Sequence, residues 1–470
     1  MADDLAFASA LELAQLVRDK QVGPVELAEL YLDRIDRLNP TINAYVTVAA
    51  EHALDTARAA EKALSAGDPD TPLPPFHGVP ISIKDLNATA GIRTTYGCAA
   101  WSDRVPDFDD EVVARIRRAG FVILGKTVTP ELGPVNVSEP PGYPPGRNPW
   151  DPERSCGGSS GGAAAALVAG LCPTSQGSDG GGSIRNPSSW CGVFGLKPSR
   201  GRISDAPREQ QFFAVQGPIT RSVQDAAALL DVMAGPAPGD AFWAPPPARP
   251  FADEVGADPG RLRVALATAP AGGEPALPSY VAAAREAADL LADLGHDVKE
   301  VELPATGDAL LPAMAMMFCA SYAAREPELP PLDTLSRWMV GMIEMGRSVS
   351  GATYVAANAT ILAALRDIAR AVSAWDILVT PTTAQQPPPV GQFADIDFTN
   401  MAQLHALTPF TGLWNMTGQP AASIPWALDD DGLPIGVQIV GPPADESIVL
   451  RVAAQIEAAH PWADWRPPVS

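Results

Sequence analysis

Two clusters of glycine and serine, joined by an alanine-rich segment, dominate the middle of the chain. The stretch 157–185 reads GGSSGGAAAALVAGLCPTSQGSDGGGSIR, with Ser159 in the first cluster and Ser183 in the second. Glycines at this density let the backbone adopt positive φ angles and approach another group closely. The segment from Gly162 to Leu171 consists mainly of good helix formers. The pattern predicts two tight turns around a helix, and it differs from flexible linkers, which repeat Gly and Ser loosely.

The length and charge of the chain limit what it can be. Its 470 residues can bury a large core, and 46% of them are hydrophobic, as in globular proteins. The formal net charge of −22 should repel phosphate backbones, so no nucleic-acid partner is expected. The acidic N-terminus MADDLAF is unlike a signal peptide, and the longest apolar run, Ala163 to Cys172, is too short to span a membrane. These features predict a cytoplasmic protein that does not associate with a membrane.

The cysteines indicate neither a disulfide framework nor a metal site. Their number is odd, and no CxxC or cysteine–histidine spacing typical of zinc occurs among Cys98, Cys156, Cys172, Cys191 and Cys319. Reduced thiols in the cytoplasm fit this pattern best. We therefore expect no metal and no other cofactor.

The periodicity of apolar residues predicts helices and strands along most of the chain. A capping box at Ser9–Glu12 starts the first helix, and a second helix is expected to begin at Pro24 and to end at Pro40. Ser222 is expected to cap a helix from Val223 to Met233. The other expected elements are helices at 51–66, 279–294 and 447–459, and strands at 44–48, 77–86, 262–267, 297–303, 421–426 and 435–440, with one more from residue 375.

One motif match is misleading. Gly120 to Thr127, GFVILGKT, fits the phosphate-loop expression GxxxxGK(S/T). The residues Phe-Val-Ile-Leu between its glycines are typical of a strand, and the following VTPELG contains a proline where a phosphate loop opens a helix. We therefore expect a strand here and no ATP site.

A lysine at the end of a strand is the best candidate for a catalytic base. In HGVPISIKDL, 77–86, apolar residues alternate with Ser82 and Lys84, and lysines are rarely buried without a task. A serine hydroxyl needs a base to become a nucleophile, and none of the five histidines lies in a motif with a serine. A desolvated lysine can accept a proton near neutral pH, and Ser159 could bridge it to a nucleophile.

Segments beyond the central stretch resemble the amidase signature family. They are GVPISIKD, GKTVTPELG, RNPWDP and LPIGVQIVG, and with the central motif they cover nearly the full length in the expected order. The resemblance implies an α/β fold with one large twisted mixed β-sheet, flanked by helices on both faces. It also implies a hydrolase that cleaves amide C–N bonds with a Ser-Ser-Lys triad.

The resemblance implies a role for each polar residue of the site. Ser183 matches the nucleophile, Ser159 the bridging serine that the family holds in a cis peptide, and Lys84 the base. Asp179 and Arg185 match a charge pair that holds the loop. The amides that match the oxyanion hole are those of Gly180, Gly181, Gly182 and Ser183.

We expect residues 1–470 to form a single amidase domain with four parts. These are an N-terminal helical wrap (1–70), a core with the active site (71–235), a Pro-rich crossing (236–261), and the remainder of the sheet with Met-rich helices that line a pocket (262–470). A monomer or a homodimer is expected.

The sequence leaves the substrate open. A Met-rich segment and a Pro-rich loop favour aryl or alkyl amides, with carbamates (urethanes) and esters as further candidates. One alternative is an α/β-hydrolase-type esterase, in which Ser159 of GGSSG would act with a histidine, His405 or His460. That motif requires a strand just before it, and PWDPERSC does not read as one. A second alternative is an amidotransferase subunit that works with partners.

Overall fold

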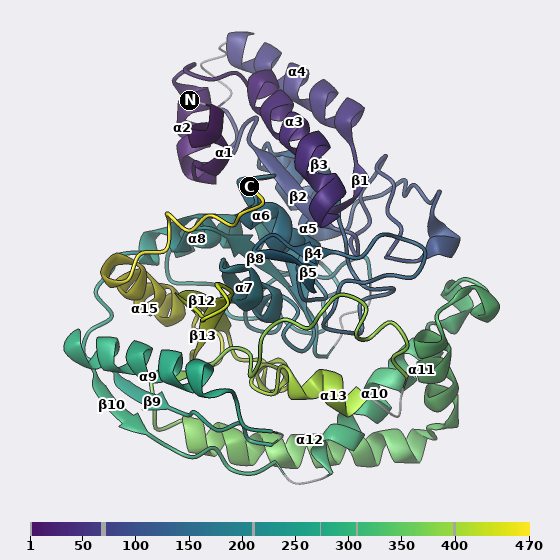
Figure 1. The fold of residues 1–470 in the computed structure, drawn as a ribbon, viewed down its shortest axis with the longest axis vertical. Coiled ribbons are helices and arrows are strands. Elements are labelled where there is room, and N and C mark those ends of the chain that lie inside the picture. The colour runs from purple at the N-terminus through teal and green to yellow at the C-terminus, as the bar shows by residue number, and fades with distance from the viewer. Residues whose placement is uncertain (1, 67–71, 209–211, 273, 307–308, 398–400) are drawn as a thin grey trace.

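The centre of the molecule is one sheet of 11 strands (Figure 1). The computed structural model describes residues 2–66, 72–208, 212–272, 274–306, 309–397 and 401–470. The strands lie in the order β1-β3-β2-β6-β8-β7-β12-β13-β11-β9-β10. Their bounds are β1 Tyr45–Val48, β2 Pro80–Lys84, β3 Val122–Thr127, β6 Thr174–Asp179, β7 Phe194–Lys197, β8 Val215–Thr220, β9 Arg263–Leu266, β10 Asp297–Glu300, β11 Ile377–Pro381, β12 Ala421–Leu428 and β13 Pro434–Val440.

The sheet is mixed, as expected for this α/β fold. Strand β2 runs parallel to β3 and β6, and β9 runs parallel to β10 and β11, whereas the other neighbouring pairs are antiparallel. Because β2 and β6 run in the same direction, their carboxyl ends lie at one edge of the sheet. Lys84 ends β2 and Asp179 ends β6, so this edge brings together two of the expected site residues.

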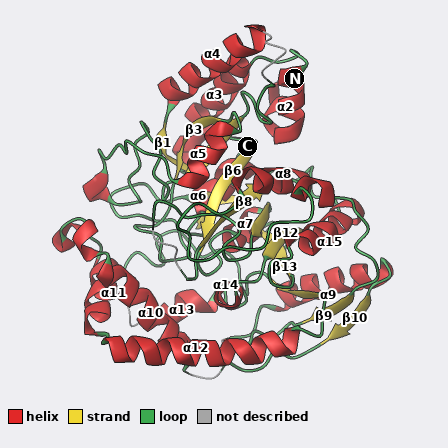
Figure 2. Ribbon diagram, turned by 180° about the vertical axis from the view of Figure 1, so that it is seen from behind, coloured by secondary structure: helices red, strands yellow, loops and turns green. Residues whose placement is uncertain are grey.

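Helices flank the sheet (Figure 2). Helices α1 to α4 gather at the end that holds β1 and β3, and α12 runs along the opposite rim beside α10 and α11. The helices are α1 Ala2–Phe7, α2 Ala10–Arg18, α3 Pro24–Ile42, α4 Ala50–Ala66, α5 Glu111–Arg118, α6 Gly161–Val168, α7 Arg185–Cys191, α8 Val223–Met233, α9 Pro278–Asp293, α10 Leu310–Ala324, α11 Arg337–Ser348, α12 Gly351–Val372, α13 Met401–Ala406, α14 Gly412–Thr417 and α15 Glu446–Ala459, with short 3-10 turns at Ala99–Trp101, Phe251–Glu254, Glu326–Glu328 and Leu332–Thr334.

Several local predictions are confirmed at the level of single residues. The Ser9–Glu12 capping box is present at the start of α2. Ser222 caps α8 by accepting a hydrogen bond from the Asp225 N–H, and α8 has the expected bounds. The segment β9–α9–β10 forms the expected unit of two parallel strands and a helix. The division of the chain into four functional parts stays a prediction.

The predicted end of α3 at Pro40 is wrong. The helix continues to Ile42, with Pro40 inside its last turn. A proline has no N–H to donate to the carbonyl four residues earlier and its ring crowds that carbonyl, a distortion that costs most in a helix interior and less in the last turn. The helix ends instead at Asn43, which adopts a left-handed conformation with φ 50° and donates its N–H to the Asn39 carbonyl at 2.7 Å.

The segment before Ser159 does contain a strand, contrary to our reading of PWDPERSC. Strand β5, Asp151–Ser155, pairs with β4, Arg147–Asn148, in a separate two-stranded sheet. The sequence of β5 is mostly charged and lacks the alternation of apolar residues that predicts a strand, since that alternation occurs only where one face of the strand is buried. The Ser155 N–H also donates to the Pro388 carbonyl at 2.8 Å, a contact that no local pattern reveals.

No single helix among the described residues has the length and apolar character to cross a membrane. The pair α11 and α12 passes that test only together, by length and composition, and it is bent by 103°.

Candidate active site

Lys84 lies at the end of β2 and is completely buried. Its Nζ donates to Ser159 Oγ at 2.8 Å, to Ser178 Oγ at 3.0 Å and to the Ser178 carbonyl at 3.2 Å. Burial lowers the pKa of Lys84 from 10.5 to about 7, although the nearby Asp179 carboxylate opposes this shift. A substantial fraction of this amine is therefore uncharged at neutral pH and able to accept a proton.

Ser159 follows β5 and precedes α6, in the first glycine cluster. The Gly158–Ser159 peptide bond is cis, as the family resemblance implies. A Cβ at Gly158 would lie 2.8 Å from the backbone of Asn136 and Val137, so the chain passes too close for any side chain here. Ser159 is almost fully buried, and its hydroxyl lies within hydrogen-bond distance of Lys84 Nζ.

Ser183 lies in the turn between β6 and α7, on the more accessible side of the site. It is half-buried, and Gly181 beside it is exposed. The Ser183 carbonyl accepts a hydrogen bond of 3.0 Å from the Ser160 N–H, which ties this turn to the residue after Ser159. The structure thus brings Lys84 and Ser159 into direct contact, whereas the Ser183 hydroxyl has no hydrogen-bond partner among the residues that the structure describes.

The amides of the second glycine cluster divide into two groups. The Gly182 N–H donates to Asp179 Oδ1 at 2.7 Å, so this amide is already satisfied. Within the described parts of the chain, the N–H groups of Gly180, Gly181 and Ser183 have no acceptor. We expected all four amides to face an oxyanion, but the Asp179 carboxylate takes one of them and leaves three free.

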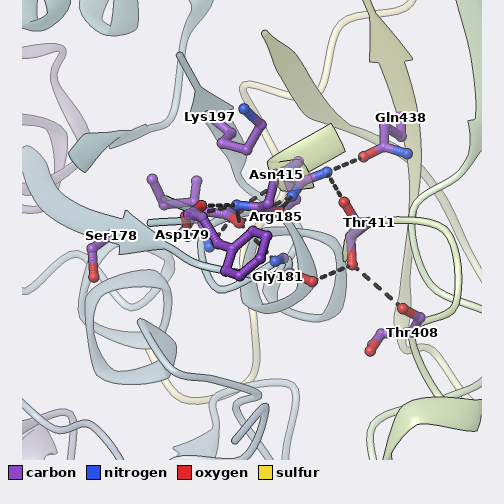
Figure 3. Close-up of polar contacts among 12 residues, drawn as sticks. Ser178, Asp179, Gly181, Arg185, Lys197, Thr408, Thr411, Asn415 and Gln438 are labelled. Atoms are coloured by element: carbon purple, nitrogen blue, oxygen red, sulfur yellow. Dashed lines mark hydrogen bonds and ion pairs between the residues drawn. The ribbon is translucent and has the colours of Figure 1, made fainter. Parts of the chain in front are cut away.

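A buried ion pair, Arg185–Asp179, stabilises the glycine turn between β6 and α7 (Figure 3). Arg185 and Asp179 are both fully buried, and two guanidinium nitrogens contact the carboxylate at 3.0 Å. Burial alone would raise the pKa of Asp179, but the charge and hydrogen bonds of Arg185 outweigh it and lower the pKa well below its ordinary value. The expected charge pair is therefore present and ionised.

Four polar residues that contact Lys84 or Arg185 escaped the sequence reasoning: Ser178, Thr411, Asn415 and Gln438. Arg185 also donates to the Thr411 carbonyl at 2.9 Å, to Asn415 Oδ1 at 2.6 Å and to Gln438 Oε1 at 2.6 Å. Ser178 lies directly before Asp179 inside the central motif, and Gln438 lies inside the segment LPIGVQIVG, but neither motif indicated what these side chains contact. Thr411 and Asn415 lie more than 200 residues after Arg185, in no motif.

An apolar wall borders the glycine turn. A Cβ at Gly180 would lie 3.8 Å from Ala214 Cβ and 3.8 Å from Phe318 Cζ. The Phe318 ring, on α10, stacks on Phe213 with a centroid distance of 5.6 Å and an interplanar angle of 8°. Met314 packs in the same cluster and is only partly buried. The Met-rich helix thus supplies apolar side chains next to the turn.

The other candidate chemistries find no support in the geometry. Strand β3 occupies the false phosphate-loop match, with all six of its residues buried. No group of three or more His, Cys, Asp or Glu residues in the described chain is arranged to hold a metal ion. The Nε2 atom of His460 lies 2.6 Å from the Trp426 carbonyl, and no hydrogen bond joins a described histidine to Ser159.

Comparison with known proteins identifies the family. A model of the amidase family matches residues 26–450. The chain belongs to the amidase signature family.

A putative amidase from Synechocystis sp. is 40% identical to this amidase, over 97% of this chain and 89% of that protein. A solved structure of 6-aminohexanoate cyclic dimer hydrolase complexed with substrate superposes with a TM-score of 0.92 at 36% identity, covering 99% of both chains. A bacterial aryl acylamidase of the same family superposes with a TM-score of 0.87 at 28% identity, covering 97% of both chains. This amidase is therefore an enzyme that hydrolyses amide C–N bonds.

The close packing around Gly182 yields a first prediction for this amidase. At Gly182, φ is +129°, and a Cβ would lie 2.3 Å from Thr411 Oγ1 and 2.4 Å from Asn186 Nδ2. Gly182→Ala should therefore lower the free energy of unfolding by about 2–4 kcal/mol, measured by urea denaturation. Gly181→Ala is the matched control, because its Cβ would meet nothing within 4 Å, and it should change stability by less than about 1 kcal/mol. Equal stability of the two variants would contradict this packing.

Proposed function

We propose that this amidase works through an acyl-enzyme on Ser183, with Lys84 as the base and Ser159 as the proton relay. The observation that supports this most is the contact of 2.8 Å between Lys84 Nζ and Ser159 Oγ in a fully buried environment. Ser183 is the more accessible serine and lies next to amides without acceptors, as a nucleophile requires. Hydrogen bonds between catalytic groups are often loose without substrate and tighten once it binds, so a Ser159–Ser183 bond is expected in the complex.

The proposed cycle conserves protons and bonds. Neutral Lys84 takes the Ser159 proton as Ser159 takes that of Ser183, and Ser183 Oγ bonds to the substrate carbonyl carbon. The resulting oxyanion accepts hydrogen bonds from the N–H groups of Gly180, Gly181 and Ser183. Ser159 then donates a proton to the leaving nitrogen, which breaks the C–N bond, and Lys84 returns a proton to Ser159. Water attacks the ester on Ser183 by the same relay and releases the carboxylic acid.

The substrate class follows from the wall of the site. Phe318, Phe213 and Met314 form an apolar surface beside Gly180, where a substrate carbonyl would lie. We propose that this amidase prefers aryl or alkyl amides to charged peptides, with carbamates and esters as further substrates. The similarity to an aryl acylamidase and to a cyclic dimer hydrolase supports small uncharged amides. A monomer or homodimer in the cytoplasm stays a prediction.

A substrate panel tests this proposal. The purified protein should hydrolyse an apolar anilide with kcat/KM at least about tenfold higher than a peptide amide of similar size that carries a charge next to the scissile bond, because burying that charge against the apolar wall is costly. The values of kcat/KM for primary amides, carbamates and esters with the same acyl group then measure how the rate depends on the leaving group. A faster reaction with the charged peptide would contradict the apolar site.

Two alternatives remain testable with the same protein. An α/β-hydrolase-type esterase with Ser159 as nucleophile requires a histidine, so His405→Ala or His460→Ala would abolish its activity. We expect both variants to stay active, because Lys84 is the residue in contact with Ser159. An amidotransferase subunit would need partners and ammonia, whereas we expect the isolated chain to hydrolyse an anilide alone.

A further inference from the structure

Both ends of one peptide group in the glycine turn are held by side chains. The peptide joins Gly181 to Gly182. Its carbonyl accepts a hydrogen bond of 2.8 Å from Thr411 Oγ1, and its N–H donates to Asp179 Oδ1 at 2.7 Å. Figure 3 shows Thr411 and Asp179 on opposite sides of this turn. Since the carbonyl and N–H of a trans peptide point in opposite directions, the two bonds fix the rotation of the whole peptide plane.

The two side chains are themselves joined through Arg185. Its guanidinium pairs with the Asp179 carboxylate and donates to the Thr411 carbonyl at 2.9 Å. Thr411 is fully buried and directly precedes α14. Asn415, on α14, donates to the Asp179 carbonyl at 2.8 Å and to Asp179 Oδ1 at 2.9 Å. The contacts form a closed ring from Asp179 through the peptide, Thr411 and Arg185 back to Asp179.

Such a ring matters because glycine leaves the turn free to rotate. Neither Gly181 nor Gly182 has a side chain to fix its backbone, and Gly181 is exposed. An uncompensated change in ψ of Gly181 or in φ of Gly182 would turn the peptides on either side of this one, and with them the N–H groups of Gly181 and Ser183, away from the substrate carbonyl. Donors that are already aligned stabilise a developing oxyanion without a cost of reorganisation at the moment of reaction.

We propose that Thr411 is a positioning residue, whose hydroxyl holds the Gly181–Gly182 peptide so that the adjacent amides are aligned for the tetrahedral oxyanion. The inference rests on the proposed function of this turn as the oxyanion site. It adds a side chain from a segment 228 positions after Ser183 to the residues that determine the rate, and it accounts for the contact between α14 and the glycine turn.

Thr411→Val tests the inference, because valine keeps the shape of threonine and removes the donor. Removing a direct oxyanion donor costs about 10²–10³-fold in kcat, and misaligning donors should cost less, about 10–100-fold. We expect kcat to fall by this factor with an anilide substrate, while KM changes by less than about threefold. The affinity for a trifluoromethyl ketone, which forms an anionic tetrahedral adduct, should fall in parallel. Thr411→Ser retains the donor and should restore kcat to within about threefold.

The control is Thr417→Val, the same change at the last residue of α14, the helix that Thr411 precedes. The Thr417 hydroxyl is buried without a hydrogen-bond partner among the described residues, so this variant should keep kcat and inhibitor affinity. If Thr411→Val does not fold, Thr411→Ala is compared with Thr411→Ser in the same assays. Wild-type kcat and inhibitor affinity in Thr411→Val, or equal losses in Thr411→Ser, would overturn the inference. Full activity of Ser183→Ala would instead overturn the proposed function, so the two failures are distinct.

Discussion

Replacing Ser183 by alanine is expected to lower kcat by about 10⁴–10⁶-fold with an anilide substrate. The hydroxyl of Ser183 is the atom proposed to bond to the substrate carbonyl, and removal of a serine nucleophile typically eliminates nearly the whole contribution of its catalytic unit. The measurement is the initial rate with enough protein to detect the residual activity. A decrease of less than tenfold would contradict the role of Ser183.

The fold should survive this change. The Ser183 hydroxyl has no hydrogen-bond partner in the described chain, so alanine should alter the free energy of unfolding by less than about 0.5 kcal/mol. Ser188→Ala is a matched control on helix α7, because the buried Ser188 hydroxyl also has no partner among the described residues. This control should keep both activity and stability, which separates loss of the nucleophile from a general effect on the helix.

Replacing Lys84 by methionine is expected to lower kcat/KM by about 10²–10⁴-fold, the usual contribution of a general base. Methionine fills a similar volume without an amine. In the wild type, the base is active only when neutral, and burial lowers its pKa to about 7. The rate should therefore rise as the pH increases through about 7 and then level off, and the variant should lose this dependence. A pH profile of kcat/KM from pH 5 to 9 measures it.

Lys197→Met is the matched control for this experiment. Lys197 is also fully buried, and burial lowers its pKa to about 7 as well. Its Nζ donates to the Pro198 carbonyl at 2.8 Å and contacts neither serine. The rise of activity through about pH 7 should therefore persist in Lys197→Met. If Lys197→Met lost this rise while Lys84→Met kept it, the group that titrates would be Lys197. That result would contradict the proposed relay.

Lys84 also makes the stability of the protein depend on pH. Its pKa is lower in the folded state than the value near 10.4 in the unfolded chain, so the folded state binds fewer protons between about pH 7 and pH 10. The contribution of Lys84 to stability is thus most favourable above the unfolded pKa and is lost as the pH falls toward 7. Lys84→Met removes this dependence and should leave the protein folded. Its loss of activity would then come from the missing base and not from unfolding.

Local chemistry explains what the sequence predicts well. The Ser9–Glu12 box and the Ser222 cap depend on hydrogen bonds within four residues, and the structure contains both. Lys84 stood out because a lysine at the end of an apolar strand needs a partner, and the structure supplies Ser159. The two caps could be predicted because their residues are close in sequence, and the contact of Lys84 with Ser159 because each residue stands in a motif of its own that marks it.

Contacts between distant segments explain what the sequence missed. Thr411 contacts the glycine turn, and Gln438 contacts Arg185, only because distant segments of the chain pack together. Gln438 lies in the segment LPIGVQIVG, but the residues of that segment do not indicate a contact with Arg185. The Gly182 amide looked free in the sequence, but the Asp179 carboxylate folds back onto it. Strand β5 escaped detection for a related reason, since its partner residues, not its own pattern, make it extended.

Covalent trapping of the acyl group tests the proposed mechanism most directly. The wild-type protein would be mixed with an activated aryl ester or anilide, quenched in acid within milliseconds to seconds, digested and mapped by mass spectrometry. We predict one acyl adduct on the peptide that contains Ser183, and none in Ser183→Ala or Lys84→Met on the same timescale. An adduct on Ser159, or turnover without any adduct on Ser183 in a pre-steady-state burst, would contradict the mechanism.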